Sequence, residues 1–211
     1  MLNTKEIEAR PAEQAKHPGI MAWITRHYTR QGLWSLFLMC AFPLHAWALI
    51  LAFRDVSWVT DRTNSWDAVG VVAYALLFTL VESALLFAVM TLLGLLISTR
   101  WDVERRVAVL SVLAFLAAVW AMLEQLFFLS GRGLPGWFID FLIQSGHPLR
   151  TLYIVLILLV SVTIAVPALL VLRTRRGLAV MRVLTDRLSL LTMFYLFLDV
   201  IGLVIVVIRN L

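Results

Sequence analysis

The chain has 211 residues, of which 62% are hydrophobic. Soluble domains are about 45–50% apolar, so this composition, with a mean hydropathy of +0.91, excludes an ordinary soluble protein and indicates a lipid-facing exterior. The net charge of +5 does not indicate a nucleic-acid partner, and we expect none, because membrane proteins collect basic residues on their cytoplasmic side.

The N-terminal segment, residues 1–31, is expected to form a cytoplasmic tail. Its first half is polar and mixed in charge, and a Pro-Gly pair then punctuates the chain. Apolar residues follow at helical spacing beside Arg26 and Arg30, which predicts either a short interfacial helix or an extension of the first span. The apolar run after the tail is too long for a signal-peptide core, so we expect it to be retained.

Apolar runs fill most of the remaining chain, and each is long enough to cross a membrane, which takes about 20 residues. In lipid the backbone must satisfy its own hydrogen bonds, and these runs are too long and too uniformly apolar for barrel strands. The sequence therefore predicts an all-α integral membrane protein, a bundle of five transmembrane helices in a single domain over residues 32–211. The expected spans are residues 33–53, 68–98, 107–129, 151–172 and 188–208.

The basic residues alternate between the segments outside these spans. The tail carries five Lys and Arg residues, residues 99–106 carry three and residues 173–187 carry five, whereas the other segments carry two, two and one. The positive-inside rule therefore places the N-terminus in the cytoplasm and the C-terminus outside. We expect a multi-pass protein of the plasma membrane, of the bacterial inner-membrane kind.

The second outer loop, residues 130–150, contains an unusual apolar segment. Residues 137–143 are too apolar for a solvated loop and too short to span, and Gly and Pro residues flank them on both sides. We expect an interfacial or re-entrant segment here. Asp140 and His147 are its candidates for a pair or an acid–base step at the outer face, although a Gly-His-Pro turn is the plain interpretation of His147.

Ionisable side chains also lie inside the apolar runs, without any Lys or Arg beside them: His45, Glu82, Glu124 and Asp199. A charge in hydrocarbon is costly, so such a group usually has a partner, a water-lined cavity or a neutral form. At about 1.5 Å per helical residue, three of them reach mid-bilayer, whereas Glu124 lies near the outer interface.

Asp199 continues a polar stripe on its helix. Ser189, Thr192 and Tyr195 precede it and Gly202 follows it at spacings that share one helical face, which should point inward. Near His45, Pro43 removes a backbone hydrogen bond from its helix.

Glu124 continues a face of small residues formed by Ala114, Ala117 and Ala121, which would let another helix approach closely.

The sequence contains no catalytic, phosphate-binding or zinc-protease motif, and its single cysteine, Cys40, cannot form an internal disulfide or a Cys/His metal cage. We expect no metal and no cofactor, and the absence of these motifs favours a protein without enzymatic activity. The leading hypothesis is a non-catalytic integral subunit or scaffold of a larger membrane complex. Its partners would be the lipid bilayer and either other membrane subunits or further copies of this chain.

Two alternatives remain open. The first is a small proton- or cation-coupled transporter or channel that uses His45, Glu82 and Asp199 at the midplane. The second is a membrane component of lipid-linked or envelope polymer processing, with Glu124, Asp140 and His147 near the outer face. The five-span plan is similar in topology to the membrane anchors of lipid and glycopolymer transferases of the alkaline phosphatase superfamily. Their outer catalytic domain and nucleophile are missing from this sequence, so the resemblance implies no residue role or activity here.

Overall fold

The computed structural model describes residues 28–97, 101–131 and 133–211, and this part of the chain is all-helical. Five helices are long and apolar enough to cross a membrane, which confirms the predicted class and the number of candidate spans. The interfacial helix expected before the first span lies outside the described residues. The five long helices are α2 (Arg30–Thr60), α3 (Ser65–Leu96), α4 (Val103–Leu129), α6 (Pro148–Arg173) and α7 (Arg175–Asn210).

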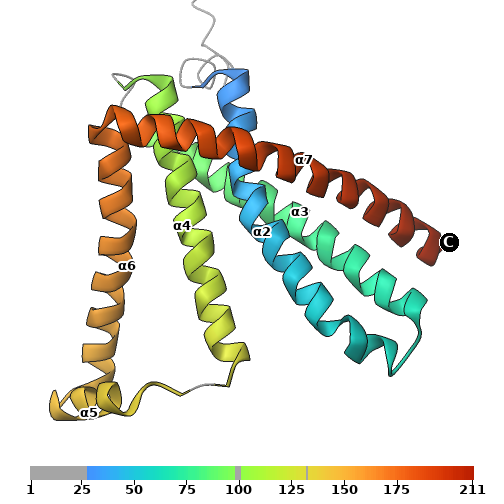
Figure 1. Cartoon of the computed structure of the whole chain (residues 1–211), viewed down its shortest axis with the longest axis horizontal. Helices are drawn as coiled ribbons and strands as arrows, with labels where there is room; N and C mark the ends of the chain where they lie inside the picture. Colours follow the sequence, from blue (N-terminus) through green and yellow to red (C-terminus); the bar gives the residue numbers. More distant parts are fainter. Residues whose placement is uncertain (1–27, 98–100, 132) are drawn as a thin grey trace, which may run out of the picture.

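Consecutive long helices run in opposite directions, so α2, α4 and α7 begin at the end of the molecule where α3 and α6 finish. We call this the arginine-rich end, because Arg30, Arg105, Arg106, Arg173, Arg175, Arg176 and Arg182 lie there. Figure 1 shows two arms that diverge from it: α4 and α6 form one arm, and α2, α3 and α7 form the other. Helix α2 packs against α3, α4 and α7, so it connects the two arms.

Helix α7 is longer than the apolar run that predicted it. It has 36 residues, or about 54 Å at 1.5 Å per residue, against a hydrocarbon thickness of about 30 Å. The segment expected as a loop, residues 175–187, is its first part. Thr174 caps the start by accepting a hydrogen bond from the Gly177 amide at 3.0 Å, and Met181 packs in a core cluster with Met39 of α2. The segment is helical because its apolar residues follow the helical period and have this cluster to cover.

Helix α5 (Gly136–Gln144) lies in the loop where an interfacial or re-entrant segment was expected. Its nine residues are too few to cross a membrane. The chain turns on either side of it at Gly131 and Gly146, whose φ angles of 61° and 71° suit glycine. Trp137 and Ile143 are exposed, and α5 packs against α6 alone among the long helices with substantial contact.

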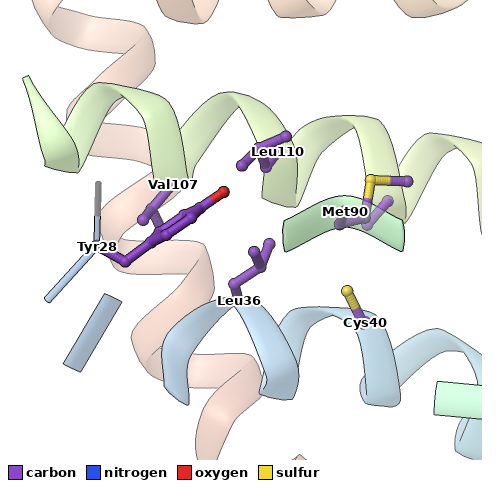
Figure 2. Close-up of a cluster of buried hydrophobic side chains, with 7 residues drawn as sticks. Tyr28, Leu36, Cys40, Met90, Val107 and Leu110 are labelled. Atoms are coloured by element: carbon purple, nitrogen blue, oxygen red, sulfur yellow. The ribbon is translucent and has the colours of Figure 1, made fainter. Parts of the chain in front are cut away.

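At the arginine-rich end, a buried tyrosine joins the two arms. Figure 2 shows Tyr28 beside Val107 and Leu110 of α4, with Leu36 of α2 close by. Its hydroxyl donates a hydrogen bond to the Thr91 carbonyl of α3 at 3.0 Å. Burial raises the pKa of Tyr28 to about 12, so this hydroxyl remains a donor at neutral pH.

At the end of the molecule opposite the arginine-rich end, Arg209 of α7 forms hydrogen bonds with the start of α3. It donates to the Trp66 carbonyl at 2.6 Å and to the Asp67 carboxylate at 2.8 Å. Gly70 makes room for the guanidinium, since a Cβ there would lie 2.6 Å from it. The two ends of α3 are therefore held by different parts of the chain, one by Tyr28 just before α2 and the other by Arg209 of α7.

The packing at Tyr28 predicts that Gly94→Ala destabilises the fold. A Cβ at Gly94 would lie 1.7 Å from the Tyr28 hydroxyl oxygen and 2.6 Å from Leu110. We expect a loss of about 1–3 kcal/mol in the free energy of unfolding, as for other overpacked cores. An SDS titration from mild detergent, followed by circular dichroism, measures it.

The matched control is Gly133→Ala, where an added Cβ meets no atom within 4 Å. Equal stability of both variants and the wild type would show that Tyr28 does not pack against Gly94.

Candidate functional site

His45 and Asp199 meet where α2 packs against α7. His45 Nε2 lies 3.0 Å from Asp199 Oδ2, and the two side chains are 0% and 3% exposed. His45 Nδ1 lies 2.8 Å from the carbonyl oxygen of Ala41, one turn earlier on α2. We call this arrangement the His45–Asp199 pair.

Hydrogen-bond chemistry fixes how many protons this pair holds. The Ala41 carbonyl can only accept, so His45 Nδ1 carries a hydrogen. The contact between Nε2 and Oδ2 then needs one more proton, because a lone pair would otherwise face a carboxylate. Either a neutral acid donates to the imidazole or an imidazolium donates to the carboxylate. The net charge is zero in both forms, which limits the cost of burial in an apolar interior.

The polar stripe predicted on α7 faces the rest of the chain. Thr192, Asp199 and Gly202 are buried. The Thr192 hydroxyl lies 2.8 Å from the Leu188 carbonyl of its own helix and 3.2 Å from the Leu38 carbonyl of α2. Thr192 and Asp199 thus hold α7 against α2.

Tyr195 and Gly202 of the stripe contact α2 and α3, respectively. The ring of Tyr195 stacks on His45, with centroids 6.2 Å apart and an interplanar angle of 11°, and Phe42 stacks on Tyr195 at 6.1 Å. A Cβ at Gly202 would lie 3.3 Å from the Ala73 carbonyl of α3. Along this stripe, helix α7 therefore touches α2 through polar and aromatic groups and α3 through a glycine.

Sequence reasoning missed that backbone carbonyls of α2 would serve as acceptors. Helix α2 continues through Pro43, which has no N–H to donate to the Met39 carbonyl. The carbonyls of Leu38 and Ala41, which flank this gap in the same turn, receive side-chain hydrogen bonds. The proline was the available signal, since it loosens the helical ladder where polar side chains approach.

Glu82 lies apart from the His45–Asp199 pair. It is exposed and lines a groove of about 510 Å³ between α2, α3 and α4, which we call the Glu82 groove. Neither His45 nor Asp199 lines this groove. Within the described part of the chain, no hydrogen bond or ion pair reaches Glu82. The structure thus brings together two of the three midplane residues that sequence analysis grouped and separates the third.

Alanines, larger apolar side chains and a few polar groups line the Glu82 groove. Trp47 of α2 donates to the Gln125 amide oxygen of α4 at 2.5 Å, which bridges two of the three walls. Asp55 also lines the groove, but Arg54 pairs with it at 2.7 Å. No Lys or Arg is among the lining residues. Its alanines are Ala48, Ala52, Ala68, Ala75, Ala118 and Ala121.

The outer-face candidates do not form a cluster. Glu124, Asp140 and His147 are all exposed, and among the described residues no hydrogen bond joins them. His147 directly precedes the first turn of α6, where its backbone N–H lies 3.4 Å from the Ser145 hydroxyl.

The alanine face that leads to Glu124 is buried only at its start. Ala114 is fully buried, whereas Ala117 and Ala121 are exposed like Glu124 itself. The close helix contact expected along this whole face is therefore limited to one position within the chain.

The described residues contain no cluster of three His, Cys, Asp or Glu side chains that could hold a metal ion. A second groove, of about 570 Å³, lies between the starts of α2, α4 and α7. Three carboxylates line it, and one of them, Glu104, forms an ion pair with Arg182.

The His45–Asp199 pair predicts an unequal response to two substitutions of Asp199. Asp199→Leu leaves His45 Nε2 without a partner, and we expect a loss of about 1–3 kcal/mol in the free energy of unfolding. Asp199→Asn should cost less than half as much, because its amide can donate to Nε2. In a double-mutant cycle with His45→Phe, we expect a coupling of about 0.6–1.7 kcal/mol.

Asp140→Asn is the matched control, because Asp140 is exposed on α5. Additive losses in the cycle would show that the two side chains do not stabilise one another.

Comparisons with protein-family models, with curated proteins and with solved structures each found no match for this chain. Its function must therefore be inferred from its own residues.

Proposed function

We propose that this chain is a non-catalytic integral subunit of a larger membrane complex. The observation that carries the proposal is Glu82, an exposed carboxylate near the middle of α3 with no hydrogen-bond or ionic partner in the described part of the chain. An ionisable group at that depth in hydrocarbon is costly unless it is paired. A partner supplied by another molecule removes that cost.

The contrast with the His45–Asp199 pair supports this interpretation. There the chain satisfies a mid-span carboxylate with its own imidazole. At Glu82 it instead leaves the carboxylate in a groove whose lining includes six alanines, and small residues favour close approach of another helix in lipid. The same chain thus contains one mid-span carboxylate that is paired within the chain and one that is available to another molecule.

We also propose that the arginine-rich end is cytoplasmic and that α5 lies in the outer interface of a plasma membrane, of the bacterial inner-membrane type. The distribution of Lys and Arg supports this orientation. Trp137, Phe141 and Ile143 are exposed on α5, and an apolar helix too short to span is stable where such side chains reach the acyl chains.

The proposal predicts that the chain leaves its native membrane as part of a larger particle. After gentle solubilisation, native mass spectrometry should find a mass above the 23.9 kDa of the single chain. Glu82→Gln should reduce the recovery of that particle, because it removes the charge that the partner meets.

Glu124→Gln is the matched control, since Glu124 is also exposed but does not line the Glu82 groove. A lone monomer recovered from the native membrane would contradict the proposal.

One observation favours a second candidate, proton transport. The His45–Asp199 pair shares a proton, and Asp199 Oδ1 is buried without a hydrogen-bond partner in the described structure. If this pair relays protons, reconstituted protein should carry a proton flux, measured with a pH-sensitive dye inside liposomes. Asp199→Asn should then abolish most of that flux, because an amide does not exchange a proton with the imidazole. Equal flux in liposomes with and without the protein would remove this candidate.

A further inference from the structure

We infer that the Glu82 groove receives a single transmembrane helix of a different protein, and that this helix carries a Lys or Arg near its middle. The inference rests on the proposed function, since it names the partner that the membrane subunit would bind. It follows from the shape of the groove, from its charge and from the residues that this chain lacks.

The groove is long. Along α3 it extends from Ala68 to Glu82, which is about 21 Å at 1.5 Å per residue. A volume of about 510 Å³ over that length leaves a narrow channel rather than a compact cavity. A compact ligand would leave most of the length unfilled, whereas a helix laid along it would contact all three walls.

The alanines favour a helix over bulkier occupants. Each of α2, α3 and α4 contributes two of them to the lining. In lipid, helices associate most closely where small residues let the backbones approach. At these alanine positions each wall leaves room for the backbone of a neighbouring helix.

The charge of the groove selects the chemistry of that helix. Asp55 is already paired with Arg54 near one end, so Glu82 is the lining carboxylate without an ionic partner in the described structure. A lipid acyl chain would place hydrocarbon against this carboxylate. A basic side chain at the same depth would instead neutralise it and donate hydrogen bonds.

A second copy of this chain does not supply such a residue. The five predicted apolar spans contain no Lys or Arg. Their one imidazole, His45, is fully buried and already bonded at both ring nitrogens. A cation at mid-span depth would therefore come from a different protein.

The test uses synthetic transmembrane peptides as probes. Three Leu/Ala-rich peptides of about 20 residues carry Lys, Leu or Glu at the centre and a dansyl group as energy acceptor. The tryptophans of the full-length protein in lipid vesicles are the donors, and one of the eight, Trp47, lies in the groove wall. Circular dichroism confirms that each protein variant keeps its helical content.

We expect the wild type to bind the Lys peptide about three- to twentyfold more tightly than the Leu peptide, the range of measured interhelical polar contacts in membranes. Glu82→Gln should abolish that preference, and Glu82→Lys should transfer it to the Glu peptide. Ala121→Leu should weaken binding of the Lys peptide by filling the groove. Ala84→Leu, on an exposed part of α3 outside the groove, is its matched control.

Equal binding of the Lys and Leu peptides to the wild type would overturn the inference, as would a preference that survives Glu82→Gln. A homodimer that forms through the groove and is lost in Glu82→Gln would also overturn it. If the native protein is nevertheless part of a larger particle, the proposed function stands and only the identity of the groove's occupant is wrong. If the native protein is a lone monomer, both fail.

Discussion

An ionisable side chain inside a membrane-spanning helix needs a partner, because hydrocarbon solvates neither its charge nor its unpaired hydrogen-bonding groups. The chain meets this constraint in two ways. His45 and Asp199 neutralise each other at 3.0 Å between α2 and α7, whereas Glu82 opens into a groove. The first contact fixes two helices of the same chain, and the second is available to another molecule.

The His45–Asp199 pair also helps to determine where the Glu82 groove lies. Thr192 and the His45–Asp199 pair hold α7 on one face of α2, while Gly202 lets α7 approach α3 at Ala73. These contacts make α2, α3 and α7 one packed arm. Helix α4 joins it through Tyr28 at the arginine-rich end and through Trp47 and Gln125 along α2. The Glu82 groove is the space left between α4 and that arm.

Sequence patterns predicted the helices well because a membrane span is defined by a local property, a run of about 20 apolar residues. The inward face of α7 followed from the spacing of Thr192, Asp199 and Gly202. Which helices are neighbours was beyond reach, because lipid-facing and buried spans have similar composition. Sequence therefore grouped Glu82 with His45 by depth alone, although Glu82 lines a groove and His45 is buried between α2 and α7. The early start of α7 was missed because charged residues interrupt its first part. Its apolar residues, Leu178, Met181 and Leu184, nevertheless follow a helical period and pack in one cluster.

The separation of Glu82 from the His45–Asp199 pair affects how transport and assembly compare as functions. A proton path needs consecutive groups that exchange protons across the membrane, yet His45 and Asp199 are buried and neither lines the Glu82 groove. The ring of Tyr195 stacks on the imidazole, and Phe42 in turn stacks on Tyr195, so aromatic rings rather than a polar route adjoin His45 on this side. Assembly needs only one uncompensated group on an accessible surface that another helix fits, and Glu82 among its alanines meets that condition. Glu82 lies apart from the His45–Asp199 pair and does not continue a proton path from it, but its place in the groove suits it to select a partner helix.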